Sequence, residues 1–122
     1  MDIFSGVDLV NKAINATLLK KEIISQNISN VDTPNYKRRD VDFESVLLKE
    51  VQNHGKENVD LDNLQPKIYT DYEKSSYRMD GNNVDIEVER SAETKVELRY
   101  NTLVTRITSQ LNRMETILQN LK

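Results

Sequence analysis

Residues that could carry catalytic or metal chemistry are few in this chain and lie far apart. His54 is the single histidine and cysteine is absent, so neither a zinc site nor a histidine-activated nucleophile has its parts. The glycines are too widely spaced to form a phosphate-binding loop; they are Gly6, Gly55 and Gly81. We therefore predict no catalytic, cofactor-binding or metal-binding residue.

Three groups of charged residues could in principle form a binding or catalytic site. Asp60-Leu61-Asp62 resembles part of a calcium loop, but the required glycine and final glutamate are missing at their spacing. Asp40 and Asp42 could act as an acid–base pair, yet in a mixed-charge extended stretch we expect them to be solvated. The basic triplet at residues 37–39 is followed at once by acids, which makes a poor nucleic-acid patch. We expect neither a nucleic-acid partner nor a small-molecule substrate.

Composition predicts one small unit. The chain has 122 residues, 37% of them hydrophobic and 30% charged, with a net charge of −3. No apolar run approaches the roughly 20 residues that span a bilayer. The first residues also lack the pattern of a cleaved signal peptide, and that alone would predict a cytoplasmic protein. Residues 32–90 carry fourteen acids and nine bases, so the acidic excess lies in the middle of the chain.

The first segment predicts a long amphipathic helix. Its apolar residues recur at three- and four-residue steps; they are Ile3, Val7, Val10, Ile14, Leu18, Ile24, Ile28 and Val31. The expected opposite face is polar and holds Lys12, Asn15, Lys20, Glu22 and Asn27. The asparagines of this segment either meet solvent or bond to neighbouring subunits, and the sequence leaves both readings open.

The last segment predicts a second helix. Asp85 suits a helix start, although the alternation of Val84, Ile86 and Val88 also allows a short strand. Beyond it lie three apolar rows, which together make a stripe broader than a dimeric coiled-coil seam. The residues of this stripe are Tyr100, Leu103, Val104, Ile107, Leu111, Met114, Ile117, Leu118 and Leu121, with Val96 at its start. Such a helix needs more than one neighbour.

The middle has no sustained helical period. We expect a half-exposed strand around Val41, a short helix from Phe43 to Val51, a mobile loop at residues 52–62 and short strands at residues 66–78. Asp80-Gly81 is a turn dipeptide. The fold class is therefore mainly α, with two terminal helices packed as a coiled-coil-like pair around a small irregular or β middle.

One turn organises the chain. Pro34 cannot continue a helix and pushes Thr33 out of the helical region. Asn30, Asp32 and Asn35 favour turns because their side chains bond nearby backbone groups. The first helix must end here, and an extended segment must follow.

The order of residues in this turn resembles the N-terminal signature of the flagellar axial proteins, which comprise rod, hook and hook-associated proteins. The signature residues are Asn27, Asn30, Thr33, Pro34 and Tyr36, with Gln26, Ile28 and Ser29 among them. Asn35 replaces the usual glycine. The stretches 37–43, 80–90 and 98–100 resemble proximal rod members of the family, whereas residues 47–79 carry no match.

The resemblance implies a non-catalytic subunit of the proximal rod that carries torque from the MS ring to the distal rod and hook. It implies homo- and hetero-oligomeric assembly with other rod proteins, an MS-ring adaptor and export-gate proteins. It also implies flagellar type III export to the periplasmic rod without a cleaved signal. Phe43 and Leu47 fit a short pattern that resembles the export-gate segment of early substrates.

We divide the single unit into a rod-core helix at 1–31, an acidic middle with the signature turn at 32–83, and a second rod-core helix at 84–122. Two alternatives remain. Another flagellar rod or hook protein is one, although the short length argues against a hook protein. A soluble helical adaptor or dimeric regulator that uses the C-terminal heptads as a coiled coil is the other.

Overall fold

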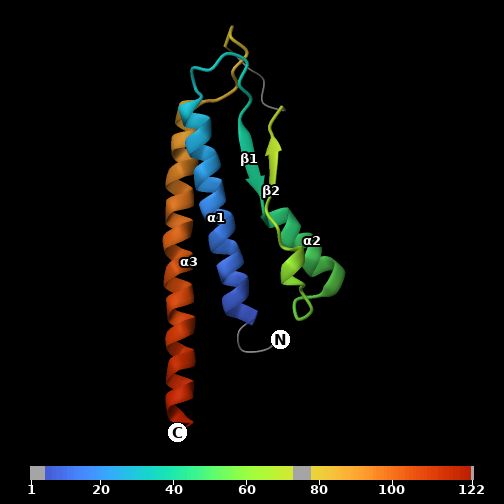
Figure 1. The fold of residues 1–122 in the computed structure, drawn as a ribbon, viewed down its shortest axis with the longest axis vertical. Helices are drawn as coiled ribbons and strands as arrows, with labels where there is room; N and C mark the ends of the chain where they lie inside the picture. Colours follow the sequence, from blue (N-terminus) through green and yellow to red (C-terminus); the bar gives the residue numbers. More distant parts are fainter. Residues whose placement is uncertain (1–4, 73–77, 122) are drawn as a thin grey trace.

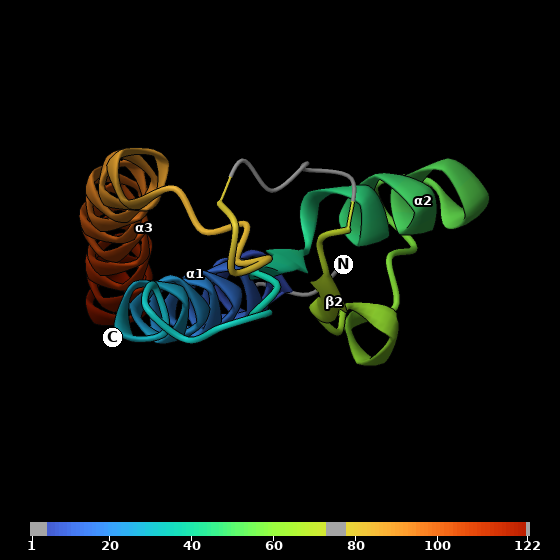
Figure 2. The same cartoon turned by 90° about the horizontal axis from the view of Figure 1, so that it is seen from above.

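The computed structural model describes residues 5–72 and 78–121, and the fold is mainly helical, as expected (Figure 1). Two long antiparallel helices, α1 and α3, lie side by side, and a two-stranded sheet with a short helix lies beside α1 (Figures 1 and 2). The elements in order are α1 (Ser5–Ser29), β1 (Arg39–Asp42), α2 (Glu44–His54), the 3-10 turn η1 (Leu61–Asn63), β2 (Lys67–Thr70) and α3 (Ile86–Asn120).

α1 packs against both α3 and β1, so its buried surface is wider than one apolar stripe. Ala16, Thr17 and Ile23 are buried although the predicted stripe omitted them, and Leu18 in that stripe is 44% exposed. Val10 and Ile24 are buried as expected, whereas Ile3 falls outside the described residues. The prediction for Leu18 was wrong because two packing partners on different sides rotate the buried face.

The two-stranded sheet pairs β1, which follows the signature turn, with β2. β1 and β2 are antiparallel, with Val41 opposite Ile68 and Arg39 opposite Thr70. Val41 is buried and β2 is exposed along its length. The strand predicted around Val41 is confirmed, and β2 confirms a strand in residues 66–78. Tyr72 lies beyond β2, and Tyr77 falls outside the described residues.

The predicted short helix is confirmed as α2 and continues to His54. The expected loop therefore begins at Gly55, whose φ of 77° ends the helix. It also contains η1, where the Asp60 carboxylate accepts the backbone N–H of Asp62 at 3.0 Å. Leu64 follows, and its side chain is fully buried.

α3 starts as the sequence predicts for a helix. The Asp85 carboxylate accepts the N–H groups of Glu87 and Val88 at 3.0 and 3.3 Å, so the alternation around Ile86 forms no strand. The helix has 35 residues, which corresponds to about 52 Å at 1.5 Å per residue. Among the helices of the described residues, none combines the length and apolar character needed to cross a membrane.

Candidate functional site

The signature turn is held by a second turn about fifty positions further along the chain. The Asn35 N–H donates to the Asp80 carbonyl at 2.7 Å, and Asn35 has a φ of 62°. Gly81 also has a positive φ, and a Cβ there would lie 2.4 Å from Asn35 Oδ1. Only glycine fits that position, which explains the Asp80-Gly81 pair. Asparagine serves at position 35 because it tolerates the left-handed region better than most residues.

Asn82 holds the end of α1. Its buried amide Nδ2 donates to the carbonyls of Asn30, Val31 and Thr33 at 2.8, 3.1 and 2.9 Å. Its Oδ1 accepts the Val84 N–H at 2.7 Å. These three carbonyls follow the end of α1 at Ser29, so a single side chain from the segment before α3 binds the signature turn at three points.

Asn27 closes the outer edge of β1. Its Nδ2 donates to the Arg39 carbonyl at 2.8 Å, and its Oδ1 accepts the Arg39 N–H at 2.9 Å. The Tyr36 hydroxyl donates to the same Oδ1 at 3.0 Å. Asn27 is fully buried, so its placement on the solvated face of the helix was wrong. The Asn27 amide pairs with the backbone of β1 as an adjacent strand would. Its hydrogen bonds are therefore made inside the chain rather than with solvent or another subunit.

The side chain of Asn83 also binds backbone groups, at Arg38 just before β1 and at Asp71 just after β2. The Arg38 N–H donates to Asn83 Oδ1 at 2.7 Å, and Asn83 Nδ2 donates to the Asp71 carbonyl at 2.7 Å. The Asp71 N–H also donates to the Arg38 carbonyl at 2.9 Å. The residues that precede α3 therefore extend the pairing of β1 and β2 by one rung.

Arg38 lies at the centre of this polar junction, which we define as residues Asn27, Tyr36, Arg38, Asp71, Asn82, Asn83 and Glu89. Its guanidinium donates to Glu89 Oε1 and Asp71 Oδ2, both at 2.7 Å, and to Asp40 Oδ2 at 3.2 Å. Arg38 and Glu89 are buried, and the expectation that Asp40 is solvated was wrong, because its half-buried side chain pairs with Arg38. A buried guanidinium requires such partners because desolvating an unpaired charge is costly.

The junction shifts the titration of two of its members. Burial alone would lower the pKa of Arg38, but its hydrogen bond with Glu89 and the charges of Glu89, Asp71 and Asp40 raise that pKa above its ordinary value. Burial raises the pKa of Tyr36, with Glu89 adding to the rise and Arg39 opposing it. Both shifts favour the protonated forms, so Arg38 stays charged and Tyr36 stays neutral at neutral pH.

The structure separates the predicted signature residues into two kinds. Asn27 and Tyr36 enter the junction directly, and Asn30 contributes a carbonyl. Thr33 and Pro34 are exposed at the tip, where the Thr33 hydroxyl donates to Asn30 Oδ1 at 3.1 Å. Reasoning from residue types did not find Arg38, Asn82, Asn83 and Glu89. The only signal was the resemblance over residues 37–43 and 80–90, which marked these stretches without assigning a role.

The apolar stripe of α3 divides along its length. Val96 is buried, and the stripe residues up to Ile107 are half-buried where α1 covers them. A Cβ at Gly6 would lie 3.7 Å from Gln110 Nε2, which places the start of α1 beside that residue. Beyond it Met114 is half-buried, and four stripe residues are exposed: Leu111, Ile117, Leu118 and Leu121. In Figure 1, α3 runs on past the start of α1.

Comparison with known proteins bears on this arrangement. A family model described as flagella basal body rod protein matches residues 12–37, which hold most of α1 and the signature turn. The chain is 32% identical over 121 residues to flagellar basal body rod protein FlgB of Aquifex aeolicus, covering 98% of this chain and 97% of that protein. It is 29% identical to FlgB of Bacillus subtilis, with 97% of each covered, and 33% identical to FlgB of Yersinia ruckeri, with 88% and 89% covered.

The chain belongs to the FlgB family of flagellar basal-body rod proteins. Its members are structural rod proteins, so the chain is a structural component and not an enzyme. Family membership also decides against the soluble adaptor that the heptads alone would suggest. The family model covers the signature residues Asn27 and Tyr36, and both belong to the polar junction.

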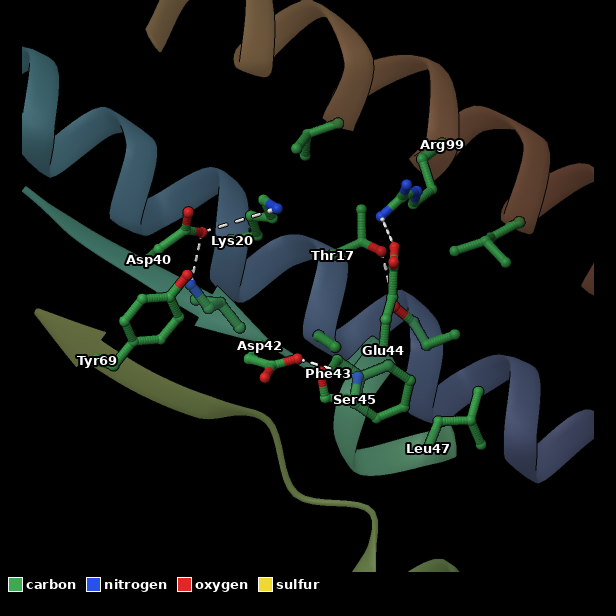
Figure 3. Close-up of a pocket in the computed structure, with 15 residues that line it drawn as sticks. Thr17, Lys20, Asp40, Asp42, Phe43, Glu44, Ser45, Leu47, Tyr69 and Arg99 are labelled. Carbon is green, nitrogen blue, oxygen red and sulfur yellow. Dashed lines mark hydrogen bonds and ion pairs between the residues drawn. The ribbon is translucent and has the colours of Figure 1, made fainter. Parts of the chain in front are cut away.

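The two residues of the export pattern line a groove in this FlgB-family fold. Phe43 and Leu47 are half-buried in a groove of about 800 Å³ between the α1–α3 pair and the start of α2 (Figure 3). Glu44 Oε1 crosses it to Arg99 Nη1 at 2.9 Å. Phe43 precedes the first residue of α2 and adopts a helical φ and ψ. Their role in export stays a prediction.

The histidine and the carboxylates that could in principle carry chemistry make local structural contacts. His54 Nε2 lies 3.6 Å from Glu50 Oε1, and Glu50 also accepts the Asp60 N–H at 3.1 Å. Asp42 accepts the Ser45 N–H at 3.0 Å in the first turn of α2. Among residues 5–72 and 78–121, no cluster of three or more histidine, cysteine or carboxylate side chains could hold a metal.

Proposed function

We propose that this FlgB-family chain is a structural subunit of the proximal rod in the bacterial flagellar basal body. It assembles with other rod proteins through its terminal helices and carries torque from the MS ring towards the distal rod and hook. It reaches the periplasmic rod by flagellar type III export without a cleaved signal, and Phe43 and Leu47 engage the export gate. An MS-ring adaptor lies among its neighbours.

The uncovered end of α3 carries this proposal. Leu118 and Leu121 are 56% and 77% exposed at the end of a stripe whose residues from Tyr100 to Ile107 are half-buried. An apolar helix face is stable in water only when something covers it, and contiguous exposed apolar residues mark interaction sites. The described part of α1 begins beside Gln110 and leaves residues 111–121 without a helical neighbour. Packing against other subunits would cover this face.

The polar junction supports the mechanical part of the proposal. It ties the end of α1, the sheet and the start of α3 together through buried hydrogen bonds and an ion pair. Satisfied buried polar networks favour one well-defined arrangement. A helical pair that is fixed at one end and apolar at the other is suited to pass a load between subunits rather than to bend.

The test compares two leucines of α3. Leu118→Asp adds a charge at an exposed position, so the free chain should fold and be secreted normally, yet packing would bury the unpaired carboxylate. We expect normal secreted protein, no rods and no swimming. Leu98→Asp is the matched control, because Leu98 is 63% exposed on the same helix but belongs to none of the apolar rows. A Leu118→Asp strain that swims would overturn the proposal.

A further inference from the structure

The uncovered end of α3 has a second property besides its apolar stripe. Lys95, Arg99, Arg106 and Arg113 follow one another at steps of four, seven and seven residues, so they form a basic row along one flank of the helix. Arg99 is paired with Glu44 within the chain at 2.9 Å. Arg106 and Arg113 are exposed, and no acid of the described residues lies within ion-pair distance of either.

A segment of opposite charge stands away from the helical pair. Residues 42–62, which we call the acidic arm, contain α2 and carry six acids against two bases, a net charge of −4. Figures 1 and 2 show α2 projecting from the α1–α3 pair, which it meets at its first turn through Glu44. On the arm Leu48 is 58% exposed, and Leu47 and Val51 are half-buried.

We propose that the end of α3 at residues 106–121 binds the acidic arm of a second copy of the chain. The arm offers acids beside apolar side chains, and α3 offers Arg113 one turn from Ile117, a stripe residue that is 59% exposed. Arg106 and Arg113 would make with the neighbour the kind of contact that Arg99 makes with Glu44 inside the chain. Residues 95–121 carry four bases and two acids, so the two surfaces also attract at longer range.

The geometry of such a contact suits a polymer. The two surfaces differ, so each copy would use its α3 end on one neighbour and its arm on another. A contact of this head-to-tail kind builds an open helical assembly when the rotation between copies does not close a ring. The inference deepens the proposed function and rests on it, because it names which surface covers the apolar end of α3.

Charge reversal tests the pairing. Arg106→Glu/Arg113→Glu places acids opposite the arm, and Glu57→Lys/Asp62→Lys places bases opposite the row. Each pair should lower the number of rods at least about tenfold, since like charges across an interface cost several kcal/mol. Combining all four substitutions should restore rods, because the charges are then exchanged. Secreted protein is measured in every strain to show that the chains are made and exported.

Matched controls separate the contact from a general effect of charge. Lys21→Glu/Arg90→Glu makes the same change in net charge at two exposed positions outside the basic row and should leave rods and swimming intact. Normal rods in the Arg106→Glu/Arg113→Glu strain would overturn the inference, whereas rods lost in Leu118→Asp would still support the proposed function. Loss of rods that the four-fold combination does not restore would also overturn it and would assign the row to a different rod component.

Crosslinking identifies the partner directly. The chain has no cysteine, so Leu48→Cys and Ile117→Cys introduce the only thiols. We expect a disulfide-linked ladder of copies in assembled basal bodies that carry both substitutions, and none in Leu48→Cys with Met79→Cys, because Met79 precedes the first residue of α3 and is far along the chain from its end. Absence of the ladder in rods that assemble normally would overturn the second-copy assignment.

Discussion

Arg38 Nε and Glu89 Oε1 lie 2.7 Å apart, and this contact joins the segment after the signature turn to the first turns of α3. Glu89 is fully buried and also accepts a hydrogen bond from Asn27 Nδ2 at 3.3 Å. One carboxylate thus connects α1, β1 and α3.

Removing one partner of the ion pair should destabilise the chain. Arg38→Leu leaves the Glu89 carboxylate buried without its cation, which costs about 3–5 kcal/mol of the free energy of unfolding. Replacing both residues by leucine should cost less, because no charge is then stranded. Denaturant unfolding measures these values. Arg90→Leu, at an exposed pair with Glu93, is the control and should change stability by no more than about 1 kcal/mol. Equal losses in the single and double variants would contradict this account.

Asn82 should matter more than its size suggests. Asn82→Ala removes the buried amide that ties the carbonyls of Asn30, Val31 and Thr33 to the segment before α3, and we expect a loss of about 1–3 kcal/mol in the free energy of unfolding. Asn58→Ala, at an exposed loop position, should be neutral. Amide hydrogen exchange at the end of α1 should rise only in the Asn82 variant. Unchanged exchange there would show that water replaces the side chain without cost.

The raised pKa of Tyr36 predicts that the chain loses a small part of its free energy of unfolding at alkaline pH. Its pKa is raised in the folded chain, mainly by burial, so the unfolded state releases this proton first as the pH rises. The stability that Tyr36 contributes is therefore fully present below its unfolded pKa of about 10 and is lost as the pH rises through the folded value. Tyr36→Phe should flatten the dependence of unfolding free energy on pH above 10. Tyr69→Phe is the comparison, since the pKa of Tyr69 is also raised by burial.

Ile107 lies where the covered and uncovered parts of the α3 stripe meet. Ile107→Asp would bury an unpaired charge in any packed helix layer, at a cost of several kcal/mol. We expect this variant to be made and exported but to form no rods, so that cells do not swim. His54→Ala should leave swimming intact, because His54 is exposed and is assigned no chemistry; its ion pair within the described residues is with Glu50. A swimming Ile107→Asp strain would argue against this helix as an assembly surface, and a non-motile His54→Ala strain would reveal a missed site.

Phe43 should be needed for export beyond its packing. Phe43→Ala removes the first residue of the pattern that ends at Leu47, so secretion should fall more than helicity. Secreted and cellular protein are compared with the far-ultraviolet circular dichroism of the purified chain. Val51→Ala is the control, because Val51 is also a half-buried apolar residue of this region but lies outside the pattern. If the two variants are secreted equally, Phe43 has only a packing role in the groove.

The sequence alone determined the elements whose signals are local. Pro34 ends α1, Asp85 starts α3, and Gly81 allows a positive φ, each through its own backbone chemistry. The heptad rows of α3 fixed an apolar stripe wider than one partner needs. The order of residues around Pro34 was specific enough to indicate the family. None of these inferences required knowledge of what lies beside each segment.

Tertiary structure decided what the polar residues do. Asn27 looks solvated on a helical wheel, and Glu89 looks like an ordinary acid near a helix start, yet both are fully buried. They are buried because β1 lies against α1 and brings Arg38 between two helices that are far apart in sequence. Leu18 is exposed for a related reason, since packing against α3 and β1 together rotates the buried face. Periodicity reports a single preferred face, and only the packed chain shows how many neighbours share it.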